Sequence, residues 1–300
     1  MTQVPAIPSQ PGPLSDGTAA FPSAPPRTGP VGELIIENVV YSCEPGYRPL
    51  FLDLRIPQSA SGALPLIVWI HGGGWMQGSR RRLPPNLSQH RLHDRMLERG
   101  YALAAVDYRL AREAAFPGMV LDVLAAIRWL RAHSATFNLA PERLTVWGES
   151  AGAHIATMLA MCTKLADVPR SGEFLDQPEA PQSVVAWYGP SDFTAIPERR
   201  GPVELLQESS GWTRAELSPL TYVRKDLPPM LLAHGTDDEQ VPVDQSRRLF
   251  AALREVGAPV DYLEVAGARH VWVNAPSADA VIDYSLAFVD RAQLGVEVAA

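Results

Sequence analysis

The 300-residue sequence predicts an α/β protein whose mostly parallel central sheet is covered by helices on both faces. Three observations carry this prediction. Apolar runs of strand length alternate along the chain with longer segments of helical periodicity. Some of the runs, such as 64–70, are continuously apolar and end in glycines, which is typical of strands buried on both faces. Hydrophobic residues make up 46% of the chain and charged residues 20%, so a substantial core can form.

The elements follow one another in a regular order. Two apolar runs near the start predict a pair of strands joined by a turn, and the alternation of strand and helix begins after them. The predicted strands are 33–42, 50–57, 64–73, 101–109, 143–150, 183–189, 228–235 and 260–267. The predicted helices are 91–100 with Gly100 as C-cap, 119–137, 151–166, 243–257 and 279–294. Because functional groups gather at the carboxyl ends of parallel strands, we expect the site at that edge of the sheet.

Two segments interrupt this rhythm. Residues 1–30 are rich in proline, glycine, serine and alanine, which predicts a flexible N-terminal extension to a single domain over 31–300. Residues 191–226 contain several prolines and a short helical pattern at 202–210. This second segment predicts a small cap inserted over the sheet.

Charge and composition exclude several kinds of partner. The formal net charge of −7 argues against nucleic acid or an anionic membrane, and the short basic run 80–82 predicts only a solvated loop. No apolar run reaches the ~18 residues that span a bilayer. No signal-peptide pattern opens the chain, so we expect a cytoplasmic protein. The sequence leaves the oligomeric state open, a homodimer included.

Ser150 is the first candidate for chemistry. It lies in the pattern G-x-S-x-G formed by residues 148–152, between a predicted strand and an apolar helix. A serine there can be the N-cap of the helix. It can also be a nucleophile on a tight strand–turn–helix elbow, where the glycines avoid collisions with neighbouring backbone. The motif alone does not choose between these alternatives.

A nucleophilic serine needs a base, and the base needs a carboxylate that orients it. In this type of fold they follow the serine in the order acid, then histidine. His270 fits, because it lies on a loop just after a late strand. The other histidines fit less well. His71 and His154 lie too close to the other motifs, and His234 ends a strand before the carboxylates. Predicted polar helix faces, where we expect solvated side chains, carry His90, His93 and His133. His90 and His93 lack the further ligands that a metal site needs, so we expect no metal.

The acid and the oxyanion loop come from two further stretches. The loop after the strand 228–235 offers Asp237, Asp238 and Glu239, and spacing alone does not separate the two aspartates. Residues 71–75 read H-G-G-G-W directly after a buried strand, which supplies consecutive unhindered N–H groups for an oxyanion. Trp75 and Met76 are candidates for lining the acyl pocket, although packing explains them equally well.

Because these motifs occur together and in this order along the chain, the chain resembles the α/β-hydrolase esterases of the hormone-sensitive-lipase type. It is most similar to the bacterial branch named after bifunctional acetylxylan and feruloyl esterases. The matching stretches include "IVWIHGGGWMQGS", "LTVWGESAGAHIA", "PPMLLAHGTDDEQVP" and "GARH", and the likeness covers about residues 35–290.

The resemblance implies particular roles. It makes Asp238 the acid, and it makes the N–H groups of Gly73, Gly74 and Ala151 the oxyanion donors. The sequence departs from the family pattern in two places that can reshape the pocket. Ala153 stands where a glycine is common, and Trp272 stands where phenylalanine is common.

The expected function is a serine carboxylesterase that hydrolyses small, short-acyl esters through an acyl-enzyme on Ser150, without a cofactor. An arylformamidase-like amidase with the same triad is the alternative, and a non-catalytic binding protein is a third reading. Short acyl groups are favoured over long ones because the cap segment has few large aliphatic side chains.

Overall fold

The computed structural model describes residues 25–43, 47–58, 62–197 and 202–295. Most of the predicted N-terminal extension, residues 1–24, lies outside the described residues. The sheet starts earlier than residue 31, because Arg27 and Thr28 pair with Ile35 and Leu34.

In the described residues the strands form one nine-stranded sheet in the order β1-β2-β3-β5-β4-β6-β7-β8-β9. The strands from β5 across to β9 are parallel, and β1, β2 and β3 form an antiparallel edge. The predicted, mostly parallel sheet is therefore confirmed. The strands are β1 Arg27–Thr28, β2 Leu34–Ser42, β3 Leu50–Ile56, β4 Leu64–Ile70, β5 Ala102–Val106, β6 Leu139–Glu149, β7 Ser183–Trp187, β8 Met230–Gly235 and β9 Val260–Val265.

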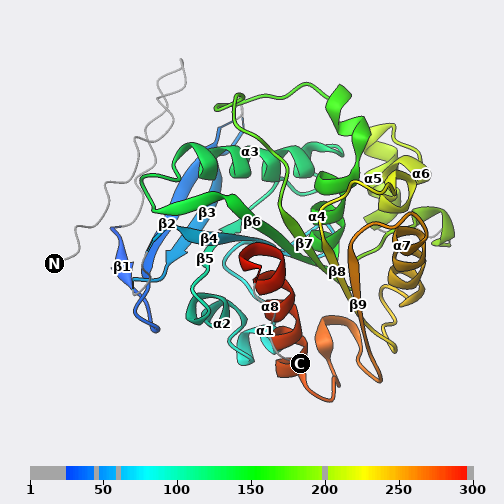
Figure 1. Cartoon of the computed structure of the whole chain (residues 1–300). Coiled ribbons are helices and arrows are strands. Elements are labelled where there is room, and N and C mark those ends of the chain that lie inside the picture. The colour runs from blue at the N-terminus through cyan, green and yellow to red at the C-terminus, as the bar shows by residue number, and fades with distance from the viewer. Residues whose placement is uncertain (1–24, 44–46, 59–61, 198–201, 296–300) are drawn as a thin grey trace.

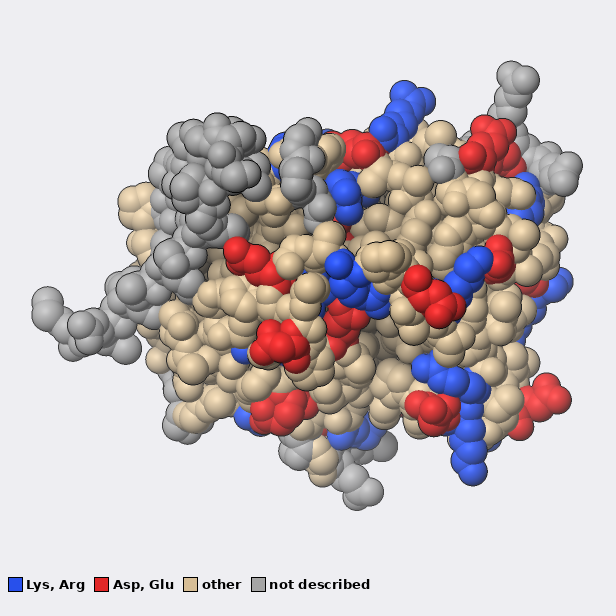
Figure 2. Space-filling model, turned by 90° about the horizontal axis from the view of Figure 1, so that it is seen from above, with Lys and Arg blue, Asp and Glu red and all other residues tan. Residues whose placement is uncertain are grey.

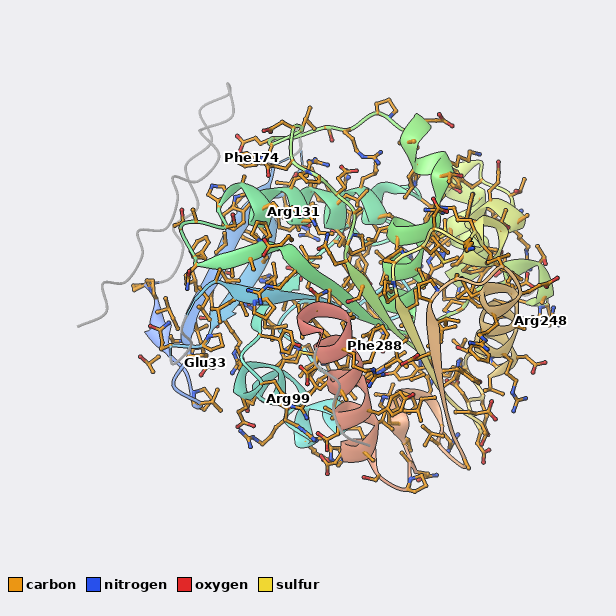
Figure 3. The ribbon with its side chains drawn as sticks, in the orientation of Figure 1. Glu33, Arg99, Arg131, Phe174, Arg248 and Phe288 are labelled. Atoms are coloured by element: carbon orange, nitrogen blue, oxygen red, sulfur yellow. The ribbon has the colours of Figure 1, made fainter. Side chains whose placement is uncertain are left out.

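Helices cover both faces of the sheet (Figure 1). Helices α3, α4 and α7 lie on one face, and α1, α2 and α8 lie on the other. Figure 3 labels Arg131 on α3 above the sheet and Phe288 on α8 beneath it. The helices are α1 Pro85–Gln89, α2 Leu92–Glu98, α3 Gly118–Ala132, α4 Ala151–Met161, α5 Pro202–Ser210, α6 Arg214–Leu217, α7 Asp244–Glu255 and α8 Ala278–Leu294, with short 3₁₀ helices η1 Thr163–Asp167, η2 Phe193–Ala195, η3 Pro219–Tyr222 and η4 His270–Trp272.

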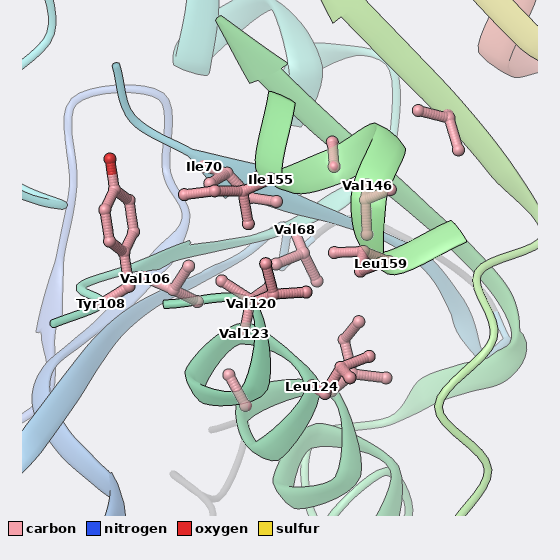
Figure 4. Close-up of a cluster of buried hydrophobic side chains, with 14 of the residues drawn as sticks. Val68, Ile70, Val106, Tyr108, Val120, Val123, Leu124, Val146, Ile155 and Leu159 are labelled. Atoms are coloured by element: carbon pink, nitrogen blue, oxygen red, sulfur yellow. The ribbon is translucent and has the colours of Figure 1, made fainter. Parts of the chain in front are cut away.

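The core follows from the two-residue period of the strands. Along β4, Val68 and Ile70 point to the α3 and α4 side, whereas Ile67 and Trp69 point to the opposite side. Figure 4 shows the first side, where valines and isoleucines of β4, β5 and β6 meet aliphatic side chains of α3 and α4. Each such side chain contributes about 1.5–3 kcal/mol by leaving water. Both faces of the central strands are buried, which explains why 64–70 reads as a continuous apolar run.

Several local predictions can be compared with the structure. Gly100 follows α2 with φ +85°, as a glycine C-cap requires, and α5 forms at the predicted 202–210. Helix α3 ends at Ala132, before the predicted Phe137, and turns lead from there to β6. The five-residue α1 was not predicted. It begins at Pro85, where a missing N–H costs nothing.

The elements between β7 and β8 correspond to the predicted cap, apart from 198–201, which lie outside the described residues. They are η2, α5, α6 and η3, and η3 packs against both α4 and α7. No helix in the described part of the chain is long and apolar enough to span a membrane.

Candidate active site

Ser150 lies on a sharp turn between β6 and α4. Its backbone has φ +54° and ψ −119°, which is rare for a residue other than glycine and stores about 1–3 kcal/mol of strain. A Cβ on Gly148 would lie 2.2 Å from the Gly152 carbonyl oxygen, and one on Gly152 would lie 2.1 Å from that of Ile70. The Ser150 side chain makes no capping hydrogen bond. The helix-cap alternative is therefore wrong, and the hydroxyl is held at the carboxyl end of β6.

A chain of hydrogen bonds leads from this hydroxyl to a carboxylate. His270 Nε2 lies 3.0 Å from Ser150 Oγ, and His270 Nδ1 lies 2.6 Å from Asp238 Oδ2. The three residues come from the ends of β6, β8 and β9, because parallel strands bring their carboxyl ends to one edge. His270 and Asp238 are 8% and 7% exposed, so water does little to screen their interaction.

The structure separates the three acidic candidates. Among the three, Asp238 is the residue that hydrogen-bonds to His270. The Asp237 carboxylate accepts a hydrogen bond from the hydroxyl of Thr236, and Glu239 is exposed and forms an ion pair with Arg269. The spacing could not make this distinction, because neighbouring residues on a tight loop point in different directions.

Asp238 is held by several donors at once. Its Oδ1 accepts the backbone N–H groups of Gln240 and Val241, each at 2.9 Å. Burial acts to raise the pKa of Asp238, but the hydrogen bonds from His234, His270 and the Val241 N–H outweigh it and hold the pKa below its usual range. The carboxylate is therefore charged at neutral pH and can stabilise an imidazolium on His270.

His234 was set aside in the sequence, yet it lies directly behind Asp238. It is fully buried at the end of β8, with Nε2 2.8 Å from the Val241 carbonyl oxygen and 3.4 Å from Asp238 Oδ2. Its Nδ1 lies 2.7 Å from the Ser246 hydroxyl. Because a carbonyl only accepts, Nε2 carries the proton. His234 thus ties the acid loop to β8 and α7. The feature of the sequence that could have indicated this role is the spacing of four residues between His234 and Asp238.

The loop 71–78 after β4 is shaped by glycines. Gly73 and Gly74 have φ +110° and +60°, and the Gly73 carbonyl accepts the N–H groups of Met76 and Gln77. A Cβ on Gly73 would lie 2.2 Å from the Gln77 carbonyl oxygen, whereas one on Gly74 would meet only Pro202 at 3.5 Å. Within the described residues, no acceptor receives the N–H groups of Gly73 and Gly74. These groups are free to donate to a ligand.

Glu149 supports the start of this loop, although the sequence analysis gave it no role. Its buried carboxylate accepts the Gly72 N–H at 2.7 Å, and it fills the space where a Gly72 Cβ would lie. Burial raises the pKa of Glu149, and the Gly72 N–H and the nearby His270 offset this only in part. The feature of the sequence that could have indicated this role is a carboxylate at the end of a buried strand, directly before Ser150.

The three predicted pocket residues differ in their surroundings. Trp75 is 4% exposed, and its indole N–H donates to His154 Nδ1 at 3.2 Å. Trp272 is 1% exposed and packs edge-to-face on Trp187. Met76 is only partly buried. Two of the three side chains therefore pack inside the protein, and whether any of them contacts a substrate stays a prediction.

The expectation of a solvated His93 is wrong. Its Nε2 is buried without a hydrogen-bond partner in the described structure, and its ring meets Trp69 edge-on at 5.4 Å. Burial lowers the pKa of His93 to about 3, with a smaller contribution from Arg55. The ring is therefore neutral and serves packing beneath β4. The described residues contain no cluster of three or more metal-ligating side chains.

The fold and the arrangement around Ser150 define an α/β-hydrolase. Residues 52–253 match the family model BD-FAE, so the chain belongs to the BD-FAE family. Among solved structures, the propionate-bound esterase Est2 of Thermogutta terrifontis is 26% identical, covers 85% of this chain and 91% of its own, and superposes with a TM-score of 0.69. A truncated carbohydrate esterase from gut microbiota has a TM-score of 0.74 at 24% identity, over 86% of this chain and 96% of its own, which shows the shared fold.

Two curated relatives are mycobacterial proteins. Esterase LipQ of Mycobacterium tuberculosis (strain ATCC 25618 / H37Rv) is 31% identical over 80% of this chain and 60% of its own length. The probable carboxylic ester hydrolase LipM of the same strain is 28% identical over 73% of this chain and 52% of its own length. The chain thus spans between about half and two thirds of the curated relatives it matches.

Proposed function

We propose that this protein is a serine carboxylesterase acting on small esters. The observation that carries the proposal is the chain of hydrogen bonds Ser150–His270–Asp238, with distances of 3.0 and 2.6 Å. It joins a strained serine, an imidazole and a buried carboxylate in the order that nucleophilic catalysis needs. The esterase names of the relatives support the same reaction and give no support to an amidase.

In the acylation step, Ser150 Oγ attacks the ester carbonyl carbon while His270 Nε2 accepts the hydroxyl proton. The Asp238 carboxylate keeps the other imidazole proton on Nδ1 and stabilises the imidazolium. The N–H groups of Gly73, Gly74 and Ala151 donate to the oxyanion of the tetrahedral intermediate. His270 then gives its proton to the leaving alcohol oxygen as the carbon–oxygen bond breaks, which leaves an acyl group on Ser150.

Deacylation reverses the roles, with water in place of the alcohol. His270 takes a proton from water, the hydroxide oxygen attacks the acyl carbonyl, and Ser150 Oγ leaves with the proton from His270. Every group needed belongs to the chain itself, so the reaction needs no cofactor.

Short acyl groups remain the preferred substrates in this proposal. The structurally similar Est2 has been obtained with propionate bound and with butyrate bound, at 26% and 25% identity. The cap segment of this chain also has few large aliphatic side chains. The cytoplasmic location expected from the sequence stays a prediction, and so does the oligomeric state.

The test is a steady-state assay on 4-nitrophenyl acetate and butyrate. We expect turnover by the parent chain and a loss of kcat of about 10³-fold or more in Ser150→Ala. A parallel 4-nitroanilide of the same acyl group should be cleaved far more slowly. Ser150→Ala with full activity would overturn the assignment of the nucleophile, and equal rates on ester and anilide would overturn the preference for esters.

A further inference from the structure

The basic run 80–82 does not act as one unit in the structure. Arg80 forms ion pairs with Asp53, at 2.9 Å, and with Asp107. Arg81 donates to Asn38 at 2.6 Å and lies 3.5 Å from Asp53. These two side chains fasten the segment to the antiparallel edge of the sheet, so their positive charges are locally balanced.

Arg82 differs from both. Its side chain is exposed and makes no hydrogen bond or ion pair to any residue in the described ranges. It instead lines a hollow of about 260 Å³, together with Gln77, Pro84, Glu149 and residues 71–73 and 78. Within the described residues, the third positive charge of the run is therefore not held in an ion pair and lines this hollow instead.

This hollow adjoins the candidate catalytic centre. The buried residues among its lining are His71, Gly72 and Glu149, and Gly73 belongs to the loop that offers oxyanion donors. Arg82 and Gln77 are exposed and form its rim. The hollow therefore lies beside the oxyanion loop and beside the residue that precedes Ser150.

The charges in the hollow are unevenly placed. The buried Glu149 carboxylate already accepts the Gly72 N–H and would repel an anion that came close. At the rim, Arg82 offers a guanidinium fork and Gln77 an amide, and a guanidinium fork fits a carboxylate better than a lysine ammonium does. Figure 2 shows acidic and basic side chains interspersed over the α3–α4 face, so that face presents no large field of one sign that would attract anions by itself.

From this arrangement we propose that the hollow is a subsite for an anionic group of the ester substrate, bound at the rim by Arg82. The inference rests on the proposed esterase function and adds a substrate class to it: esters that carry a carboxylate on either the acyl or the alcohol part. The two sources present the same chemistry to Arg82, so they are separated by experiment.

The experiment uses two matched pairs of chromogenic esters. In one pair the acyl part is charged or neutral: mono-4-nitrophenyl glutarate and its methyl ester. In the other pair the leaving group is charged or neutral: the acetate of 5-hydroxy-2-nitrobenzoate and that of its methyl ester. The variants are Arg82→Gln, Arg82→Lys, and Arg254→Gln as a control that removes an exposed arginine of α7.

We expect Arg82→Gln to lower kcat/KM about fivefold for the anionic member of one pair, the size of an exposed ion pair, while the neutral member changes less than about twofold. Arg82→Lys should restore part of the loss, and Arg254→Gln should change neither ester. NaCl at about 1 M should abolish the preference, because it shortens the screening length to about 3 Å. The pair that responds shows whether the anion lies on the acyl or the alcohol part.

Two outcomes would overturn the subsite. One is an unchanged ratio of anionic to neutral rates in Arg82→Gln for both pairs. The other is an equal change in Arg254→Gln. Either result would leave the esterase function intact as long as the neutral esters are hydrolysed. A parent chain that hydrolyses none of the four esters would instead refute the proposed function.

Discussion

The acid loop around Asp238 follows β8 and the oxyanion loop 71–78 follows β4, two strands of the same sheet, but the two loops are held in place by different means. Side chains fix the acid loop: His234 and His270 both reach Asp238. Beyond its start, where Glu149 accepts the Gly72 N–H, the oxyanion loop is shaped by glycine backbone, and a Cβ on Gly73 would lie 2.2 Å from a carbonyl oxygen. The geometry of the acid loop therefore depends on which side-chain atoms carry protons, and the geometry of the oxyanion loop depends on the free space around its glycines.

This difference predicts which kind of substitution should disrupt each loop. A substitution that keeps shape but alters hydrogen bonding should damage the acid loop and leave the oxyanion loop unaffected. A single added methyl group should do the reverse. The predictions below test this contrast, from the largest expected effect to the smallest.

Asp238→Asn should have the largest effect. The amide is the same size, but it can donate a proton to His270 Nδ1, which favours the wrong imidazole tautomer. In the Ser-His-Asp template, the same change costs about 10⁴-fold in kcat, and we expect a loss of about that order. Asp237→Asn is the matched control, because its carboxylate contacts Thr236 instead. Similar kcat values for the two variants would contradict the assignment of Asp238 as the acid.

Gly73→Ala should come next, with a loss of about 10²-fold in kcat, the size of one oxyanion donor. Its Cβ would collide with the Gln77 carbonyl, so the loop must shift. Gly74→Ala is the neighbouring control, since it also has positive φ but meets only Pro202 at 3.5 Å. A larger loss in Gly74→Ala than in Gly73→Ala would show that steric clearance at Gly73 is not what holds the donors.

His234→Leu should lower kcat about tenfold with little change in KM, because the leucine cannot donate to the Val241 carbonyl or to Asp238. His234→Gln places an amide donor near the same position and should recover part of the activity. Thermal unfolding of both variants separates this effect from a loss of folding. An unchanged kcat in a folded His234→Leu would mean that the backbone N–H groups alone position Asp238.

Glu149→Gln should give the smallest effect, and it should appear in stability. The pKa of Glu149 is raised on folding, so its ionisation costs stability as the pH rises through the folded-state pKa, and costs nothing below the unfolded-state value. The glutamine keeps an acceptor for the Gly72 N–H without the charge. We expect Tm to rise by about 3 °C at pH 7.5, roughly what 1 kcal/mol gives in a chain of this size, and by less at pH 4. A gain that is larger at pH 4 would contradict this account.

The sequence predicted the parts of the site that have strong local signatures. Ser150 between two glycines and the glycine run 72–74 each follow a buried strand, so both their identity and their edge of the sheet could be predicted. Element order followed from periodicity, although the end of α3 did not, because turns and polar residues also occur within helical patterns.

The remaining parts depend on contacts that no periodicity encodes. Asp237 and Asp238 are equivalent in spacing, and only the direction of each side chain on the loop separates them. His234 was set aside, and Glu149 received no role, because their functions lie in contacts to Val241 and Gly72. His93 was misjudged since its ring packs under Trp69, which comes from a strand distant in the chain. Arg82 differs from Arg81 only in what surrounds it.

The central claim is that Ser150 is the nucleophile and is activated through His270. The most direct measurement is the reaction of the purified protein with an alkyl fluorophosphonate, followed by intact mass and peptide mapping. We predict one adduct per chain on the peptide that contains Ser150, no adduct in Ser150→Ala, and a strongly slowed reaction in His270→Gln. An adduct on another residue, or equal labelling of the parent and Ser150→Ala, would contradict the account.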